Sequence, residues 1–169
     1  MAIASCSTTR DGINRMIPDV TIRNGNVNDA ARLAELSEVL GYPVTPEVMR
    51  RRPETILLKR DHVVAVAEVP PNLIAGWIHA AEQDILEVGS FCEIVGLVVA
   101  ANQRGQGIGR RLLERVEHWA LKRGLTQISV RSNVARLESH PFYERSGYVR
   151  VKTQHAYRKQ IRQAAQASD

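Results

Sequence analysis

The sequence predicts an α+β domain built around a mixed β-sheet. Two β-rich runs, His62–Val69 and Leu73–Ala80, are separated by a Pro-Pro-Asn turn, which indicates a pair of antiparallel strands. A third run, Phe91–Val99, is apolar on both faces and is followed by a helical pattern and then by the β-rich run Thr126–Arg131. Two strands joined through a helix predict a right-handed parallel β-α-β crossover at the centre of the sheet.

The first half of the chain adds elements before and after the hairpin. Apolar residues from Ala30 to Leu40 recur at helical spacing, and Thr45 followed by Pro46 is a typical helix start, because threonine caps the helix and proline fits its first turn. The elements predicted here are a strand at Val20–Arg23, a helix capped by Asn28 or Asp29 and ending near Leu40, a helix opened by Thr45-Pro46-Glu47 and broken at Pro53, and a polar loop at Glu82–Ser90.

The second half begins with the crossover helix, whose apolar residues run from Ile108 to Ala120 and which Gly124 ends. A short helix is then expected within residues 133–146, followed by final strands at Tyr148–Lys152 and His155–Arg158. The complete prediction is a mostly antiparallel sheet of six or seven strands with helices on both faces. Residues 1–17 are expected to form a disordered extension, residues 18–160 a single domain and residues 161–169 a frayed tail.

Length and composition limit the possible classes of protein. The 169 residues suffice for one domain with a substantial core. The net charge is +5, but 18 acidic residues are mixed with 23 basic ones and aromatic residues make up only 5%, so no nucleic-acid surface is indicated. No apolar run reaches the length of a membrane span. Cys6 and Cys92 are too few for a metal site, and we expect a cytoplasmic protein without membrane, metal or disulfide.

The glycine-rich segment Arg104–Gly109 links the central strand to the crossover helix. Three glycines in five positions allow a backbone with positive φ and close approach of a ligand. At a helix N-terminus, unpaired N–H groups and the helix dipole favour a phosphate, and Arg104, Arg110 and Arg111 add positive charge. The segment therefore predicts a polyphosphate site, and the simpler alternative is a tight turn without a ligand.

Two common phosphate motifs do not fit this segment. A Walker loop needs Lys followed by Ser or Thr after the last glycine, where Arg110 and Arg111 stand. A dinucleotide fingerprint counted from Gly105 puts Arg110 at the position of its last glycine. What remains is R-x-x-G-x-G after an apolar strand.

This loop resembles the acyl-CoA loop of the GNAT superfamily of N-acetyltransferases. A second similarity lies further on, where Asn133 follows a strand and a helix ends in the run Phe142-Tyr143-Glu144-Arg145-Ser146-Gly147, like the F-Y-E-x-x-G pattern of these proteins. Both motifs occur in the expected order and together they cover about Glu93 to Tyr148. The resemblance implies the GNAT fold and acetyl-CoA as co-substrate.

The resemblance also implies roles for individual residues. Glu93 would be the base that takes a proton from the amine, and Tyr143 would protonate the sulfur of CoA. Residues implied in CoA binding are Leu97, Val98 and Val99 for the pantetheine arm, Arg104, Gly105, Gln106, Gly107, Ile108, Gly109 and Arg110 for the pyrophosphate, and Asn133 and Phe142.

Several of these roles have alternatives that the sequence leaves open. Glu93 could be a paired structural acid, with His79 or a water chain as the base, and Tyr143 could be a core aromatic residue. Arg131 and Arg136 depart from the small residues expected near Asn133, and they are interpreted as solvated charges or as contacts to a CoA phosphate.

The predicted function is acetyl transfer from acetyl-CoA to a primary amine, of a small molecule or an aminoglycoside-like compound, by direct attack in a ternary complex. The alternative is a non-catalytic acyl-CoA binding or sensing module. A nucleotide-binding protein is disfavoured by the missing Walker lysine. The acceptor amine is not identified by the sequence, and a homodimer through the C-terminal strands is a guess based on the family.

Overall fold

The structure is a computed structural model that describes residues 19–161. The described chain divides into two compact units, one ending at Arg131 and one beginning at Ser132, and each is described by itself below. The predicted extension 1–17 and the part of the predicted tail after Ile161 lie outside the described residues. No helix in the described part of the chain is long and apolar enough to cross a membrane.

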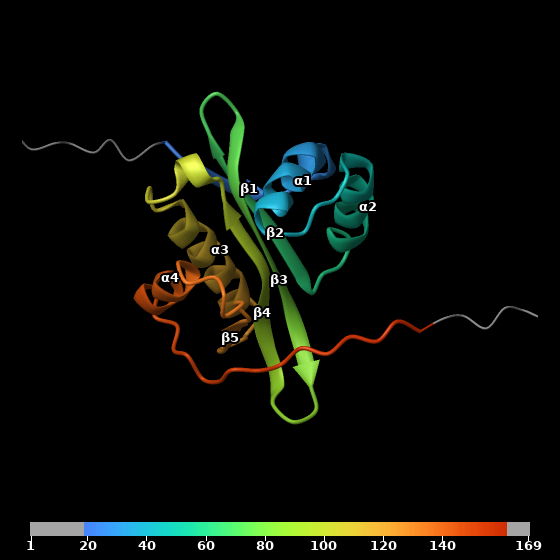
Figure 1. Cartoon of the computed structure of the whole chain (residues 1–169), viewed down its shortest axis with the longest axis vertical. Helices are drawn as coiled ribbons and strands as arrows, with labels where there is room; N and C mark the ends of the chain where they lie inside the picture. Colours follow the sequence, from blue (N-terminus) through green and yellow to red (C-terminus); the bar gives the residue numbers. More distant parts are fainter. Residues whose placement is uncertain (1–18, 162–169) are drawn as a thin grey trace, which may run out of the picture. The chain divides into compact units, whose positions relative to one another are not determined.

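The first unit contains one five-stranded sheet with the strand order β1-β2-β3-β4-β5 (Figure 1). Neighbouring strands from β1 to β4 are antiparallel, and β5 is parallel to β4. The strands are β1 Thr21–Asn24, β2 His62–Val69, β3 Leu73–Ile85, β4 Gly89–Val99 and β5 Ile128–Val130. The predicted mixed, mostly antiparallel sheet with a parallel β-α-β crossover is therefore confirmed, and the parallel pair β4–β5 lies at one end of the described sheet instead of at its centre.

Helices cover both faces of this sheet, with α1 and α2 on one face and α3 on the other (Figure 1). The apolar stripe of α3 is almost fully buried, as its periodicity predicts, and Gly124 ends the helix with a φ of 76°. On the other face α1 packs Leu33 and Leu36 against Val66 and Val98 of the sheet. The helices of this unit are α1 Ala30–Val39, α2 Pro46–Ile56 and α3 Ile108–Lys122, with short 3-10 turns η1 Val27–Asp29 and η2 Ala101–Gln103.

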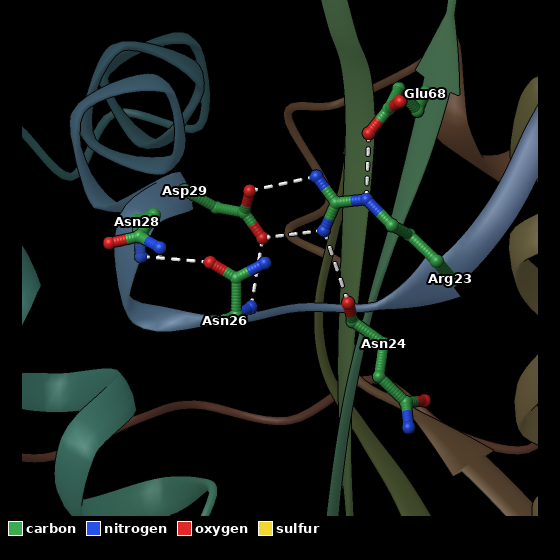
Figure 2. Close-up of polar contacts among 6 residues, drawn as sticks. All are labelled: Arg23, Asn24, Asn26, Asn28, Asp29 and Glu68. Atoms are coloured by element: carbon green, nitrogen blue, oxygen red, sulfur yellow. Dashed lines mark hydrogen bonds and ion pairs between the residues drawn. The ribbon is translucent and has the colours of Figure 1, made fainter. Parts of the chain in front are cut away.

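A polar cluster fixes the start of the first helical segment to the edge of the sheet (Figure 2). The Arg23 guanidinium donates to both carboxylate oxygens of Asp29, each at 2.9 Å, and its Nε donates to Glu68 on β2 at 2.7 Å. Asp29 also accepts from the backbone N–H of Asn26, whose side chain accepts from the N–H of Asn28. Asn26, rather than the predicted Asn28 or Asp29, thus provides the side-chain cap. The carboxylate of Asp29 is only 6% exposed, and Arg23 and the N–H of Asn26 supply its hydrogen bonds.

Two local predictions in the first unit are wrong. Pro53 does not break α2, which continues to Ile56. Proline cannot donate a backbone hydrogen bond, but its ring is buried here, and the packing of the ring compensates for the missing bond. Of the predicted loop 82–90, only residues 86–88 form a turn, since β3 extends to Ile85 and β4 begins at Gly89. A hairpin supplies each strand with its hydrogen-bonding partner, so the ladder continues through polar residues such as Asp84, which accepts from the Ser90 hydroxyl at 2.5 Å.

The second unit contains α4, Ser139–Arg145, and the predicted final strands are absent from its described residues. Residues 148–161 have no regular secondary structure, and Val149 and Val151 are 82% and 85% exposed. Alternating valines predict a strand only where a neighbouring strand takes up their backbone hydrogen bonds, and none is paired here. The described sheet has five strands instead of six or seven, and a dimer through these segments stays a prediction.

Candidate active site

Strand β4 has different neighbours along its two halves. It pairs with β3 from Gly89 to Val99, but β5 pairs only with Cys92–Ile94. In the described sheet the second edge of β4 from Val95 to Val99 therefore has no strand partner. Backbone N–H and C=O groups along this open edge are available to a ligand.

A bulge separates these two halves of β4. The pairing with β3 shifts between His79 and Ala80, so that Val95 has no opposite residue. The next residue, Gly96, lies against the ring of Trp77, since a Cβ added to Gly96 would lie 2.9 Å from two of the ring carbons. The buried indole N–H of Trp77 has no acceptor within residues 19–161, which leaves one donor beside the bulge.

The predicted phosphate loop forms an open turn between η2 and α3. Gly105 and Gly107 have φ angles of 76° and 79°, and nothing lies within 4 Å of a Cβ added at either position. The first backbone hydrogen bond of α3 runs from the N–H of Arg111 to the carbonyl of Gly107, so the amides from Ile108 to Arg110 have no acceptor within the helix. A cradle of bare amides at the N-terminus of a 15-residue helix fits a pyrophosphate group.

The arginines around this cradle are placed differently from one another. Arg104 is exposed and donates to the carbonyl of Val99 at 3.4 Å, and the exposed Arg110 pairs with Glu114 at 3.0 Å. Arg111 instead donates to the carbonyl of Val20 at 2.8 Å. Arg104 and Arg110 therefore supply the positive charge near the cradle, whereas Arg111 binds the backbone next to β1.

Glu93 lies on β4, opposite Ala81 of β3 and in register with Ser129 of β5. Its side chain is 12% exposed, and its Oε1 lies 2.5 Å from Nη2 of Arg131, whose side chain is 78% exposed. The neighbouring Cys92 points to the opposite face, where burial raises the pKa of its thiol to about 11. Glu93 is therefore a nearly buried carboxylate whose charge is balanced by one exposed guanidinium.

Two histidines occupy the same face of the sheet as Glu93. Nδ1 of His62 and Nε2 of His79 are 2.9 Å apart and the two rings stack, with centroids separated by 5.2 Å. Burial, together with the neighbouring His62, lowers the pKa of His79 from 6.5 to about 4. His79 is therefore a neutral imidazole at neutral pH, and its lowered pKa makes it a weaker base than an ordinary histidine.

The remaining predicted site residues belong to the second unit. The side chain of Asn133 accepts from the N–H of Ala135 at 2.9 Å, so it shapes the turn that precedes α4. The Tyr143 ring lies edge to face with Phe142 and Tyr148, at centroid distances of 5.1 and 5.7 Å. Burial raises the pKa of Tyr143, which keeps the phenol protonated at neutral pH.

The first unit thus brings together Glu93, the open edge Leu97–Val99 and the cradle, because β4 leads directly through η2 to α3. Sequence reasoning missed the partner of Glu93 and the histidine pair. Arg131 follows Ser129 by two residues, so strand alternation puts both on one face, but only the observed register between β4 and β5 puts Glu93 beside them. Arg131 thus forms an ion pair with Glu93 while its side chain stays 78% exposed, and its contact with a CoA phosphate stays a prediction.

Comparisons with known proteins agree with this architecture. The sequence model of the acetyltransferase (GNAT) family matches residues 31–148. Glucosamine 6-phosphate N-acetyltransferase 1 of rice (Oryza sativa subsp. japonica) is 30% identical over 116 residues, which cover 66% of this chain and 68% of the relative.

Solved structures share the fold at lower identity. An aminoglycoside 6'-N-acetyltransferase from Acinetobacter baumannii superposes with a TM-score of 0.75 at 16% identity, covering 84% of this chain and 99% of the other. Glucosamine-6-phosphate N-acetyltransferase from Arabidopsis thaliana gives a TM-score of 0.70 at 24% identity, covering 82% and 97%. With the family match over most of its length, the chain belongs to the acetyltransferase (GNAT) family and is an acetyl-CoA-dependent N-acetyltransferase.

Proposed function

We propose that this enzyme transfers the acetyl group of acetyl-CoA to a primary amine of a small molecule, by direct attack within a ternary complex. The observation that carries the proposal is the arrangement along β4, where Glu93, the bulge, the open edge and the glycine cradle follow one another. A cofactor bound along this path extends from the cradle toward the carboxylate. The rice relative, named for acetyl transfer to an amino sugar phosphate, supports a small-molecule acceptor.

The proposed contacts with CoA use backbone groups for most of its length. The amides of Gly105 to Arg110 hold the pyrophosphate, with Arg104 and Arg110 as nearby positive charges. The backbone of Leu97–Val99 binds the pantetheine arm as an added strand would bind, because this edge is open in the described sheet. Asn133 and Phe142 of the second unit are proposed as further contacts.

Acetyl-CoA supplies an acetyl group on a thioester. An alkyl ammonium has a pKa near about 10, so the acceptor must lose a proton before it attacks. The carboxylate of Glu93 takes this proton, directly or through water, and the Tyr143 hydroxyl donates one at the sulfur of the departing thiol. Burial raises the pKa of Tyr143, so the phenol carries its proton at neutral pH but gives it up less readily to a thiolate.

The direct test is thiol release from acetyl-CoA with a panel of primary amines. We expect turnover with at least one amine. Double-reciprocal plots of the initial rate should give intersecting lines, as a ternary complex requires, whereas parallel lines would indicate an acyl-enzyme. Tyr143→Phe should lower kcat at least 10-fold with little change in the Kd of CoA. CoA binding without turnover on any amine would instead support the alternative, a binding or sensing module.

The cradle is tested by a matched pair of glycine substitutions. Gly107→Ala and Gly124→Ala place a methyl group at positions with similar φ, 79° and 76°, and with open space around the added carbon. The backbone strain is therefore similar, but only the first methyl group lies where the phosphates should bind. Calorimetry should show at least a 10-fold weaker Kd for CoA with Gly107→Ala and an unchanged Kd with Gly124→Ala. Equal effects would argue against the cradle.

A further inference from the structure

We propose that the acceptor of this enzyme is a zwitterionic amine, whose anionic group, a phosphate or a carboxylate, binds Arg131 while its amine faces Glu93. The inference rests on the proposed function and adds the class of substrate. It makes Arg131 a specificity-determining residue of the acceptor site.

The first argument is the position of Arg131. The parallel register of β4 and β5 puts Ser129 beside Glu93, and Arg131 follows Ser129 on the same face. This is the face covered by α1, because Glu93 pairs with Ala81, and Ala81 alternates along β3 with Trp77, which packs against the core cluster of α1. The guanidinium therefore stands next to the proposed base, at the place where an amine has to arrive.

The second argument is how little of Arg131 is used by the protein. Its side chain is 78% exposed, and within residues 19–161 the guanidinium has Oε1 of Glu93 as its one partner, through Nη2. An arginine has five N–H donors in a planar fork that matches phosphate and carboxylate oxygens. Most of these donors are thus available to an anion, although Arg131 already has a fixed neighbour.

The third argument concerns charge. Glu93 is nearly buried, so its negative charge needs a positive partner, and Arg131 provides it in the absence of an acceptor. A purely cationic amine would add a second positive charge next to Arg131, and the two would repel each other. An acceptor with an anionic group attracts Arg131 instead. Arg131 then lies next to this anionic group, and the acceptor amine lies next to Glu93, so that positive and negative groups alternate. The exposed ion pair is a weak contact that such an acceptor can rearrange.

The relatives are consistent with this selectivity. The rice protein, at 30% identity, is named for glucosamine 6-phosphate, which carries an amine and a phosphate. The aminoglycoside acetyltransferase structures are 14–17% identical and show the fold alone. We therefore predict that the positive charge next to Glu93 favours acceptors with an anionic group.

The experiment compares acceptors that differ only in the anionic group. Thiol release from acetyl-CoA is measured with glucosamine 6-phosphate against glucosamine, and with an amino acid against its amide, so the two pairs distinguish phosphate from carboxylate. For at least one pair we expect the anionic member to have a kcat/KM at least 10-fold higher. Arg131→Gln should lower that value at least 10-fold, mainly through KM, and should change the neutral member less than 3-fold.

Two further variants keep the test specific. Arg131→Lys retains the charge but not the planar fork, and it should recover part of the kcat/KM that Arg131→Gln loses. Lys122→Gln also removes one positive charge, at the end of α3 on the other face of the sheet, and should leave both members of each pair unchanged. Thermal unfolding shows whether each variant is folded.

The possible failures are distinguishable. The enzyme could release thiol with neutral or polycationic amines while neither anionic acceptor has a higher kcat/KM than its neutral counterpart. This result would overturn the present inference and leave the proposed function intact. An equal loss with Arg131→Gln on both members of a pair would show that Arg131 acts only through Glu93. The absence of thiol release with every amine would overturn the proposed function itself, and this inference with it.

Discussion

Replacement of His79 should remove a pH dependence from the stability of the folded protein. In the folded state the pKa of His79 is lowered from 6.5 to about 4 by burial and by the adjacent His62. The folded protein therefore keeps this ring neutral where the unfolded chain already binds a proton. Because a depressed histidine pKa favours proton uptake by the unfolded chain, the stability from this site is complete above about pH 6.5 and is lost as the pH falls toward about 4.

The size of the effect follows from the two pKa values. The pKa of His79 is 6.5 in the unfolded chain and about 4 in the folded protein. This difference lowers the free energy of unfolding by about 2 kcal/mol when the pH falls from 7 to 5. The His79 ring is partly exposed, and solvent screening reduces this value. We therefore expect the wild type to lose between about 1 and 2 kcal/mol more than a variant without this histidine.

Urea unfolding at pH 7 and pH 5 measures the difference, with His79→Gln as the variant. His118→Gln is the matched control, because it also removes one histidine, from an exposed position on α3. The control should lose as much stability between the two pH values as the wild type, since it retains His79 and the lowered pKa of that ring. Equal losses in wild type and His79→Gln, or an NMR titration of His79 with a midpoint near 6.5, would refute the reasoning.

Three further substitutions test the packing around the site. Gly76→Ala should destabilise the fold by about 3 kcal/mol in urea unfolding, because the added Cβ would lie 2.6 Å from the carbonyl oxygen of Val98; a loss below about 1 kcal/mol would contradict this contact. In a Cys6→Ser variant, Cys92 should react with a disulfide reagent at pH 8 at least about 100-fold more slowly in the folded chain than in the urea-unfolded chain, because burial raises the pKa of its thiol to about 11. Comparable reaction rates would contradict the burial of Cys92. Asp29→Asn should cost about 2 kcal/mol, because it weakens a buried ion pair and a helix cap together, and an unchanged unfolding midpoint would show that the cluster of Figure 2 contributes little.

The elements that the sequence predicted well have their determinants close together in the chain. The apolar stripe of α3 and its terminal Gly124 are local features, and so is the turn that pairs β2 with β3. Pro53 and the final strands were predicted wrongly, because their outcome depends on contacts outside the segment. The buried ring of Pro53 keeps α2 intact, whereas Val149 and Val151 find no neighbouring strand in the described structure.

The candidate site divides in the same way. The sequence predicted the cradle because positive φ at Gly105 and Gly107 is a requirement of the local backbone, and the structure has it. The sequence could not predict the pair of Glu93 and Arg131, because it depends on a register between parallel strands joined through a whole helix. The pairing of His62 with His79 depends similarly on the register of the β2–β3 hairpin.

The bulge at Val95 explains how one strand can serve two purposes. Before the bulge, β4 is held between β3 and β5, which fixes Glu93 beside Arg131. A bulge bends and twists its strand, so the residues after it diverge from the line of β5. Leu97–Val99 consequently keep their pairing with β3 but have no strand on the other edge, and this edge continues into the cradle. The bulge at Val95 therefore separates the open backbone edge of Leu97–Val99 from the paired part of β4 that carries Glu93.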